Sequence, residues 1–325
     1  MVSGALAVAM TACAAPDPLP SWNDTQTKRD IVAFVESVSD EASTDFVPEA
    51  ERIATFDNDG CLWAEQPAYF QLLFAMDRAK ALAPNHPEWA DQEPFKSAIA
   101  GDLKAVAAQG VPALMELVMA THAGMTADEF AGSVMLWLAS ERHPTLDRPY
   151  TELIYAPQLE LLDYLSDHGF KVFIVSGGGA DFVRVWSQNV YGIPPERVVG
   201  SRIKAKYDVV DGIPTIVKLP EVDLIDDKEG KPVGIHQHIG RRPIFAGGNS
   251  DGDLAMFEYT AAGDGPRFCL LVHHTDADRE WAYDRESHVG KLDKALDAAE
   301  EQGWAVVDMA RDWNVVFAPV AATAE

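Results

Sequence analysis

The stretch Ile53–Trp63, which reads IATFDNDGCLW, decides the fold of this chain. Ile53–Phe56 is a short run of apolar and β-branched residues, and it predicts a buried strand that runs straight into the motif DNDG at residues 57–60. Residues two apart on an extended chain point to the same side, so Asp57 and Asp59 project together from the strand end. Two adjacent carboxylates need a cation, and oxygen ligands favour Mg²⁺. A polar turn with two hydrated Asp side chains is the simpler alternative.

Helical and strand patterns alternate along the chain outside this stretch. Before residue 150 the pattern is helical, with helices expected over 25–39, 70–82, 95–108, 112–121 and 127–140. After residue 150, strands are expected at 171–175, from 197, at 243–246, 268–273 and 305–309, and helices over 157–167, 180–191, 253–260 and 291–302. Thr126 and Glu129 form a predicted capping box, and Asp211-Gly212 a predicted hairpin turn. The fold class is therefore α/β with a doubly wound parallel sheet, in which ligands bind at the carboxyl ends of the strands.

Two further polar clusters follow predicted strands. Ser176 and Gly177 begin the segment SGGG after KVFIV, where a hydroxyl and bare N–H groups before a helix can bind an anion. A tight turn explains this segment nearly as well. The segment GGNSDGD at residues 247–253 supplies the oxygen side chains of Asn249, Asp251 and Asp253. Lys231 lies between the two clusters and is a candidate for a fixed positive charge, with Lys218 as its rival.

In this order the motifs resemble those of the haloacid dehalogenase superfamily, whose members mostly hydrolyse phosphate esters. The family pattern is strand–DxDGT, strand–S/T-G, Lys, and strand–G-(D/N)-xxx-D. This chain matches it with residues 57–61, with Ser176-Gly177, with Lys231 and with residues 248–253. The resemblance covers roughly residues 50–275, and four motifs in one order form a specific signal. It implies a Rossmann-like core with an inserted helical cap.

The resemblance also implies a role for each matching residue. Asp57 is the nucleophile that becomes an aspartyl phosphate, and Asp59 is first general acid and then general base. Ser176, with the N–H groups beside it, holds the phosphoryl oxygens, and Lys231 neutralises charge. Gly60, Gly177, Glu65 and Trp63 complete the expected set of phosphate- and substrate-contacting residues. Mg²⁺ is expected on Asp57, the Asp59 carbonyl, Asn249 and Asp253, with Asp253 as the main carboxylate of the third motif.

Two positions depart from the family pattern. Asn249 stands where many relatives carry a metal-binding Asp, which predicts a lower affinity for Mg²⁺. Cys61 replaces the usual Thr, and because a thiol is a poorer hydrogen-bonding group, we expect a looser loop or weaker activity.

Trp63, Glu65 and Tyr69 follow the first motif, and an acidic and aromatic pair would suit a cationic substrate head. Taken one at a time, these residues have a simpler explanation: the aromatic side chains pack between helices, and the Glu side chain is hydrated.

The motif spacing predicts the domain organisation. Residues 25–63 and 151–325 form the expected catalytic core, and residues 64–150 the helical cap of a phosphoserine phosphatase-like branch. Residues 1–24 are expected to be a signal segment and linker, with Cys13 in a lipoprotein-like context. The protein is then exported, periplasmic or membrane-anchored in a bacterium; otherwise it is cytoplasmic. No Lys or Arg precedes the apolar run, which weakens the signal interpretation.

The charge of the chain excludes some partners. A net charge of -25 over 325 residues argues against binding of nucleic acids or anionic membranes, apart from a lipid anchor at Cys13. The expected partner is a small phosphorylated substrate, and the sequence leaves the oligomeric state open. The leading hypothesis is a phosphomonoesterase. The alternatives are a phosphomutase, a dehalogenase (which would usually lack the second Asp), and a non-catalytic binding protein in which Cys61 and Asn249 mark decay.

Overall fold

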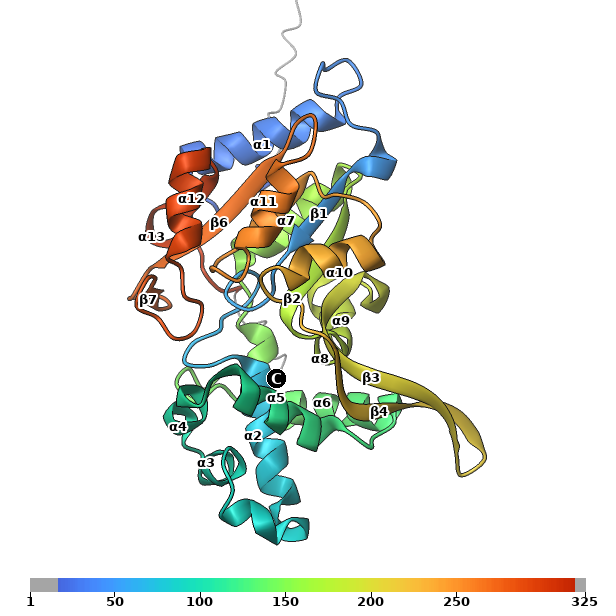
Figure 1. Cartoon of the computed structure of the whole chain (residues 1–325). Coiled ribbons are helices and arrows are strands. Elements are labelled where there is room, and N and C mark those ends of the chain that lie inside the picture. Colours follow the sequence, from blue (N-terminus) through green and yellow to red (C-terminus); the bar gives the residue numbers. More distant parts are fainter. Residues whose placement is uncertain (1–16, 319–325) are drawn as a thin grey trace, which may run out of the picture.

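The computed structural model describes residues 17–318, and its centre is an eight-stranded sheet with the order β4-β3-β2-β1-β5-β6-β7, to which β8 adds beside β6 (Figure 1). The strands are β1 (Ile53–Phe56), β2 (Lys171–Gly179), β3 (Val198–Val210), β4 (Ile213–Leu224), β5 (Phe245–Gly248), β6 (Phe268–Thr275), β7 (Ala282–Tyr283) and β8 (Ala305–Asp308). Only the β3–β4 and β6–β7 pairs among these are antiparallel. The predicted doubly wound, mostly parallel α/β class is therefore confirmed.

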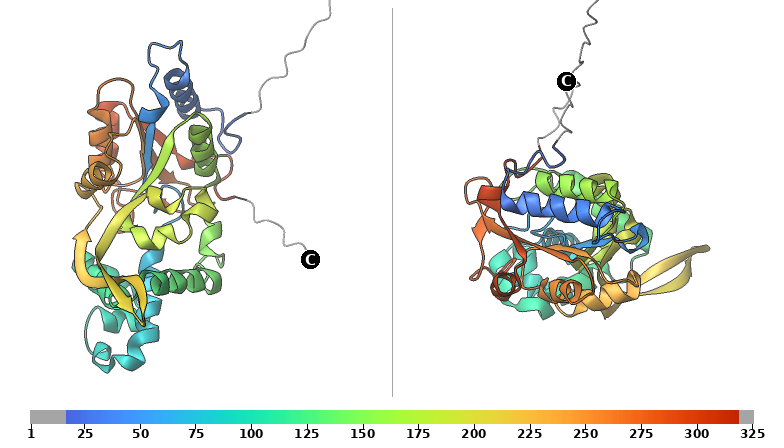
Figure 2. Two further views of the ribbon diagram at one scale, coloured as in Figure 1. Left: turned by 90° about the vertical axis from the view of Figure 1, so that its right-hand side faces the viewer. Right: turned by 90° about the horizontal axis from the view of Figure 1, so that it is seen from above.

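Helices cover both faces of the sheet, as Figure 2 shows from above. The helices are α1 (Gln26–Ser39), α2 (Phe70–Leu82), α3 (Phe95–Ala100), α4 (Leu103–Ala108), α5 (Gly110–His122), α6 (Ala127–Ser140), α7 (Ala156–Asp167), α8 (Ala180–Arg184), α9 (Ser187–Tyr191), α10 (Gly230–His238), α11 (Leu254–Ala261), α12 (Lys294–Gln302) and α13 (Met309–Asp312). Strand side chains alternate between the faces. In β6, Leu270 and Val272 pack in the cluster that includes α1 and α7, whereas Cys269 and Leu271 pack with α10, α11 and α12.

Helices α2 to α6, which follow β1 in the chain, lie beyond the carboxyl ends of the strands (Figure 1). They have a small apolar cluster of their own, in which Leu72 and Met76 of α2 pack with Trp89 and Phe95. The predicted bounds of α2 and α6 are confirmed, as is the capping box at the start of α6. The helix predicted over 95–108 is wrong in one respect, because Gly101 adopts a φ of 73° and divides it into α3 and α4.

Strands β3 and β4 form a long hairpin that reaches past the sheet toward the helical region (Figure 1). Its two-residue turn has φ 51° at Asp211 and 81° at Gly212, which is the geometry that twisted hairpins prefer. The hairpin docks on the helices through the backbone, because the Lys218 N–H donates to the Met125 carbonyl at 2.9 Å. The Gly124 N–H in turn donates to the Lys218 carbonyl at 2.9 Å. Two inserted elements therefore meet over the strand ends.

Residues 17–24 pack on the core, where the sequence had suggested a free linker. Leu19 and Trp22 are buried, and the Trp22 ring meets Trp313 edge-on at 6.0 Å. Residues 1–16, which include Cys13 and the predicted signal, lie outside the described residues. Within residues 17–318, the structure contains no helix with the length and apolarity needed to cross a membrane.

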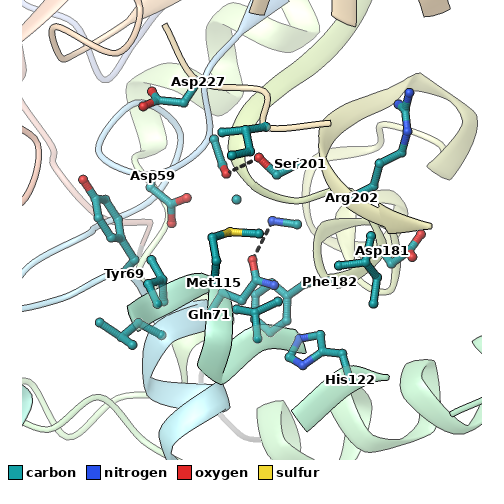
Figure 3. Close-up of a pocket in the computed structure, with 18 of the residues that line it drawn as sticks. Asp59, Tyr69, Gln71, Met115, His122, Asp181, Phe182, Ser201, Arg202 and Asp227 are labelled. Atoms are coloured by element: carbon teal, nitrogen blue, oxygen red, sulfur yellow. Dashed lines mark hydrogen bonds between the residues drawn. The ribbon is translucent and has the colours of Figure 1, made fainter. Parts of the chain in front are cut away.

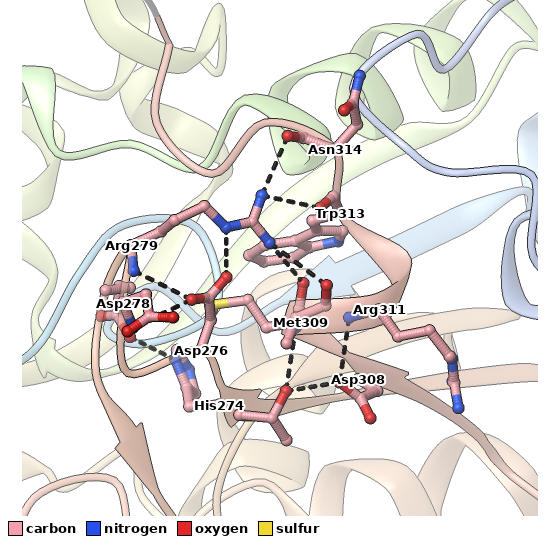
Figure 4. Close-up of polar contacts among 12 residues, drawn as sticks. His274, Asp276, Asp278, Arg279, Asp308, Met309, Arg311, Trp313 and Asn314 are labelled. Atoms are coloured by element: carbon pink, nitrogen blue, oxygen red, sulfur yellow. Dashed lines mark hydrogen bonds and ion pairs between the residues drawn. The ribbon is translucent and has the colours of Figure 1, made fainter.

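A network of polar contacts fixes the end of β6 to the C-terminal part of the chain (Figure 4). Arg279 pairs with Asp276 and donates to the carbonyls of Trp313 and Asn314 at 3.0 Å each. The Thr275 hydroxyl donates to Asp308 at 2.6 Å. This anchoring fixes the strand end from which His274 points toward residues 57–60.

Candidate active site

The first polar cluster meets a buried ammonium at the end of β1. The Lys231 Nζ donates to Asp57 Oδ1 at 2.7 Å and to the Val175 carbonyl at 2.6 Å, and it pairs with Asp253 Oδ1 at 2.8 Å. Lys231 is 1% exposed and lies in the first turn of α10, a helix that the sequence pattern did not predict. One ammonium thus joins the first and third polar clusters.

Negative charge exceeds positive charge around Asp57. Burial raises the pKa of the Asp57 carboxyl well above its usual range, the charge of Asp253 raises it further, and Lys231 opposes both. Burial lowers the pKa of Lys231, but the two carboxylates outweigh burial and the net pKa is raised. Asp59 adds to the repulsion on Asp57. A further cation at this position would relieve that repulsion.

Asp59 is held by Trp63. The Trp63 indole N–H donates to Asp59 Oδ1 at 2.8 Å, and the ring stacks on Trp186 at 4.3 Å. Burial raises the pKa of Asp59, and the Trp63 hydrogen bond opposes this. The other carboxylate oxygen lies by the second cluster, since a Cβ at Gly178 would be 3.4 Å from Asp59 Oδ2. Trp63 is therefore placed to position Asp59, rather than in the cavity wall where a substrate-contacting residue was expected.

The second cluster forms the end of β2, which continues to Gly179 instead of ending at Val175 as the sequence predicted. Ser176 is fully buried, and its Oγ accepts from the Gly178 N–H at 3.0 Å, so its own proton is free for another acceptor. The Gly179 N–H donates to Gln71 Oε1 of α2 at 2.6 Å. Gln71, which the sequence did not single out, thus places an uncharged oxygen at an N–H suited to an anion.

The three polar side chains of the third cluster, those of Asn249, Asp251 and Asp253, have different partners. Asp253 Oδ2 accepts from the N–H groups of Asn249 and Ser250 at 2.9 and 3.0 Å, while its Oδ1 faces Lys231. Asp251 Oδ1 accepts from the N–H groups of Asp293 and Ala295, both at 2.9 Å, and so caps the start of α12. Asn249 Oδ1 is buried and has no hydrogen-bond partner among the described residues. Asp253 is thus engaged by Lys231 and by two N–H groups, whereas Asn249 Oδ1 is left without a partner within residues 17–318.

Gly60 allows two side chains to approach the first cluster. Asn249 Nδ2 and the Tyr283 hydroxyl both donate to Glu65 Oε1 at 2.7 Å. A Cβ at Gly60, whose φ is 74°, would lie 2.1 Å from Asn249 Nδ2 and 2.3 Å from Glu65 Oε1. The Gly60 N–H donates to the Trp63 carbonyl at 2.8 Å, so it is not available for the phosphate contact that the sequence suggested.

We expect Gly60→Ala to lower both stability and any activity of the site. The change costs backbone strain at positive φ and also displaces Asn249 and Glu65, for a destabilisation of about 1–3 kcal/mol. Gly212→Ala is the matched control, because Gly212 also has a positive φ of 81° but nothing within 4 Å of an added Cβ. Thermal unfolding of both variants measures the difference. An equal loss of stability in the two would show that the close contacts at Gly60 carry no weight.

Cys61 does not leave the loop unsupported. Cys61 is fully buried, with Gln158 Nε2 donating toward its Sγ at 3.9 Å. The Cys61 and Leu62 N–H groups donate to the Asn58 carbonyl at 3.2 and 2.8 Å. His274 Nε2 lies 2.8 Å from the Gly60 carbonyl. These contacts support the loop in the absence of the threonine hydroxyl, and a looser loop or weaker activity stays a prediction.

A cavity of about 260 Å³ opens from Asp57 and Asp59 toward the helical region (Figure 3). Glu65 and Tyr69 line it, as the sequence suggested. Its far wall includes the apolar side chains of Met115 and Phe182 and the polar groups of His122, Asp181 and Lys218. Neither His122 nor Asp181 was expected at the site from the sequence. Lys218, the rival of Lys231, pairs here with Asp181 and lies 4.5 Å from the centre of the Phe130 ring.

Comparison with known proteins gives one family match. Residues 54–258 match the family model described as haloacid dehalogenase-like hydrolase, and this range includes every motif above. No curated protein matches the chain.

Among solved structures, a conserved functionally unknown protein from Anaerococcus prevotii DSM 20548 is 15% identical. The match covers 89% of this chain and 93% of that protein, with a TM-score of 0.57, which supports the fold. A protein of unknown function from Bordetella pertussis Tohama I is also 15% identical, over 80% and 99% of the two chains, with a TM-score of 0.49. A substrate-bound phosphoserine phosphatase is 15% identical, over 68% and 86%, with a TM-score of 0.35.

Proposed function

This chain belongs to the haloacid dehalogenase-like hydrolase family, and from that premise we propose that it is a Mg²⁺-dependent phosphomonoester hydrolase acting through an aspartyl phosphate. The observation that carries the proposal is the convergence of Asp57, Asp59, Ser176 and Lys231 at one end of the sheet, next to a cavity. Phosphoryl transfer needs in-line placement and charge compensation, and these groups supply both.

The reaction divides into two displacements at phosphorus. An Asp57 oxygen forms a bond to phosphorus while the bond to the leaving alcohol oxygen breaks, and the Asp59 carboxyl gives that oxygen its proton. Asp59, now a carboxylate, then takes a proton from a water molecule as the water oxygen attacks phosphorus. The Asp57–phosphorus bond breaks, inorganic phosphate leaves, and Asp59 again carries its proton. Trp63 holds Asp59 in position for both transfers.

The remaining groups stabilise the transferred phosphoryl oxygens. The proposed donors are the hydroxyl of Ser176, which adjoins the cavity-lining Gly177, and the N–H of Gly179. A phosphoryl oxygen would replace Gln71 Oε1 at that N–H, and the exchange favours the anion because charge-assisted hydrogen bonds are the stronger ones. Lys231 offsets the charge of Asp57 before the first step and that of the phosphoryl group during it.

The donors around Asp57 fit Mg²⁺. Among the described residues, no three side chains of His, Cys, Asp or Glu are grouped as a metal site. The expected donors are instead the Asp57 carboxylate, the Asp59 carbonyl and Asn249 Oδ1, a buried oxygen without a partner in the part of the chain that the structure describes. Hard oxygen donors with few protein charges and several waters are typical of Mg²⁺. The ion supplies charge compensation for the phosphoryl oxygens.

We expect Asn249→Ala to raise the Mg²⁺ concentration needed for half-maximal activity by about tenfold or more, because it removes the donor oxygen. Asp251→Ala is the matched control in the same loop, and it should weaken the start of α12 without changing the Mg²⁺ requirement. Activity titrations with Mg²⁺ measure both. A larger shift for Asp251→Ala than for Asn249→Ala would reverse the assignment of the donor.

The proposal is tested by the hydrolysis of p-nitrophenyl phosphate with Mg²⁺ and with EDTA. We expect release of nitrophenol and phosphate that requires Mg²⁺. Release of halide from a haloacid without phosphatase activity would favour the dehalogenase alternative. Transfer of the phosphoryl group from one position to another within one substrate would favour the phosphomutase alternative. Binding of Mg²⁺ without turnover of any phosphate ester would favour the non-catalytic protein.

A further inference from the structure

The far end of the cavity contains a buried hydrogen-bond acceptor with no partner. His122 is 3% exposed, lines the cavity, and lies at the end of α5 opposite Asp59 (Figure 3). Its Nε2 is buried and has no hydrogen-bond partner among residues 17–318. An unpartnered buried polar atom is costly, so a group that faces a cavity in this state indicates a ligand.

The neighbours of His122 determine which ring nitrogen carries the proton. The Thr121 hydroxyl has one hydrogen and donates it to the Leu117 carbonyl at 2.7 Å. With its hydrogen on the Leu117 carbonyl, the hydroxyl accepts from His122 Nδ1, which lies 2.8 Å away. Burial lowers the pKa of His122 to about 3, and the charge of Lys218 contributes, so the ring is neutral. Nε2 consequently presents a lone pair and accepts a hydrogen bond.

The surroundings of this acceptor are mostly apolar. Leu114, Met115 and Val118 of α5 line the same cavity with Phe130 and Phe182. The His122 ring packs on Phe130 at 4.6 Å. Lys218 acts on His122 more strongly than any other charge, and it reaches the cavity from the docked hairpin already paired with Asp181.

We propose that this part of the cavity selects phosphomonoesters whose leaving group is an uncharged, largely apolar alcohol with a distal O–H or N–H that donates to His122 Nε2. The inference rests on the proposed phosphatase activity and specifies its substrate class. Apolar walls favour a hydrocarbon body, the single acceptor favours one donor, and the Lys218–Asp181 pair leaves no unpaired charge there for a charged head. This substrate class differs from the cationic substrate head that Trp63, Glu65 and Tyr69 suggested in the sequence.

A site built around a buried acceptor discriminates against ligands that leave it unpaired. We therefore expect ω-hydroxyalkyl phosphates to exceed the matched n-alkyl phosphates in kcat/KM by about tenfold or more at the chain length that reaches His122. ω-Aminoalkyl phosphates, which are cationic, should fall below the hydroxyl series. His122→Phe keeps an aromatic ring against Phe130 but removes the acceptor, and should reduce the ratio of hydroxyalkyl to alkyl esters to about one.

Two variants serve as controls. His122→Gln restores an acceptor at a similar reach and should recover part of the hydroxyl preference. His86→Phe makes the matched change in a half-exposed histidine that stacks on Trp89, away from the cavity lining, and should keep the full preference. Thermal unfolding establishes that each variant is folded.

The outcomes separate this inference from the phosphatase proposal. Hydrolysis of both ester series with no hydroxyl preference at any chain length, or a preference that persists in His122→Phe, would overturn the inference and leave the phosphatase standing. If no ester is hydrolysed, the phosphatase proposal fails, and calorimetric binding of free alkanediols and matched alkanols still tests the subsite. Equal binding of the two by the wild type would overturn it; tighter diol binding that His122→Phe abolishes would support it.

Discussion

Asp57→Asn is expected to lower kcat for any phosphate ester by about 10⁴-fold or more, because an amide cannot form the bond to phosphorus that the reaction requires. The change keeps the size of the side chain and one oxygen near Lys231, so the fold should be retained. It also removes the buried negative charge of residue 57. In the wild type this charge is repelled by Asp253, and that repulsion raises the pKa of Asp57. Stability should therefore stay the same or rise while activity disappears, a combination that a merely structural Asp57 would not give.

Asp211→Asn is the matched control for this experiment. Asp211 is exposed in the hairpin turn at φ 51°, a conformation that Asn adopts readily. Single-turnover kinetics and denaturant unfolding should give the same rate and the same stability for this control as for the wild type. Full activity in Asp57→Asn would remove Asp57 as the nucleophile, whatever the control does.

Lys231→Met is expected to destabilise the protein by about 3–5 kcal/mol, since it leaves the Asp57 and Asp253 carboxylates buried without their cation. Activity should also fall, by about 10²- to 10³-fold, because charge stabilisation of the phosphoryl group is lost. Urea unfolding and the hydrolysis assay measure the two effects.

Two comparisons isolate the buried charge as the cause. Lys204→Met changes an exposed lysine of the hairpin that pairs with Glu221 and should cost little stability. Adding Asp253→Asn to Lys231→Met removes one of the uncompensated carboxylates and should recover part of the lost stability. Equal stability of Lys231→Met and the wild type would contradict the role of this ion pair.

The sequence predicted the parallel sheet and the end of β1 because those features depend on local patterns, whereas β2 extends to Gly179, beyond its predicted end. The apolar run Ile53–Phe56 and the boundaries of α2 and α6 follow from periodicity and capping. Helix α10 was missed because Gly230, Pro232 and Gly234 disfavour a helix, and tertiary packing around Lys231 stabilises it instead.

The sequence predicted those residues of the site that belong to the family motifs. Lys231 meets Asp57, and Ser176 and Asp59 both approach Gly178, as the motif order suggested. The division of labour within 249–253 was not predictable, because the partners of Asp251 lie at the start of α12, far along the chain. His122 and Lys218 carry no motif at all, and only the docking of the hairpin on the helices brings them to the cavity.

The most direct measurement of the central claim is the mass of the peptide that contains Asp57, after acid quenching of the Asp59→Asn variant mixed with p-nitrophenyl phosphate. Nitrophenol leaves without help from a general acid, whereas the water of the second step needs the base that Asp59→Asn removes, so the intermediate should accumulate. We predict one phosphoryl group on Asp57, in an amount equal to the burst of nitrophenol, and none when Asp57→Asn is added. A burst or steady turnover with no phosphoryl group on Asp57 would contradict the account.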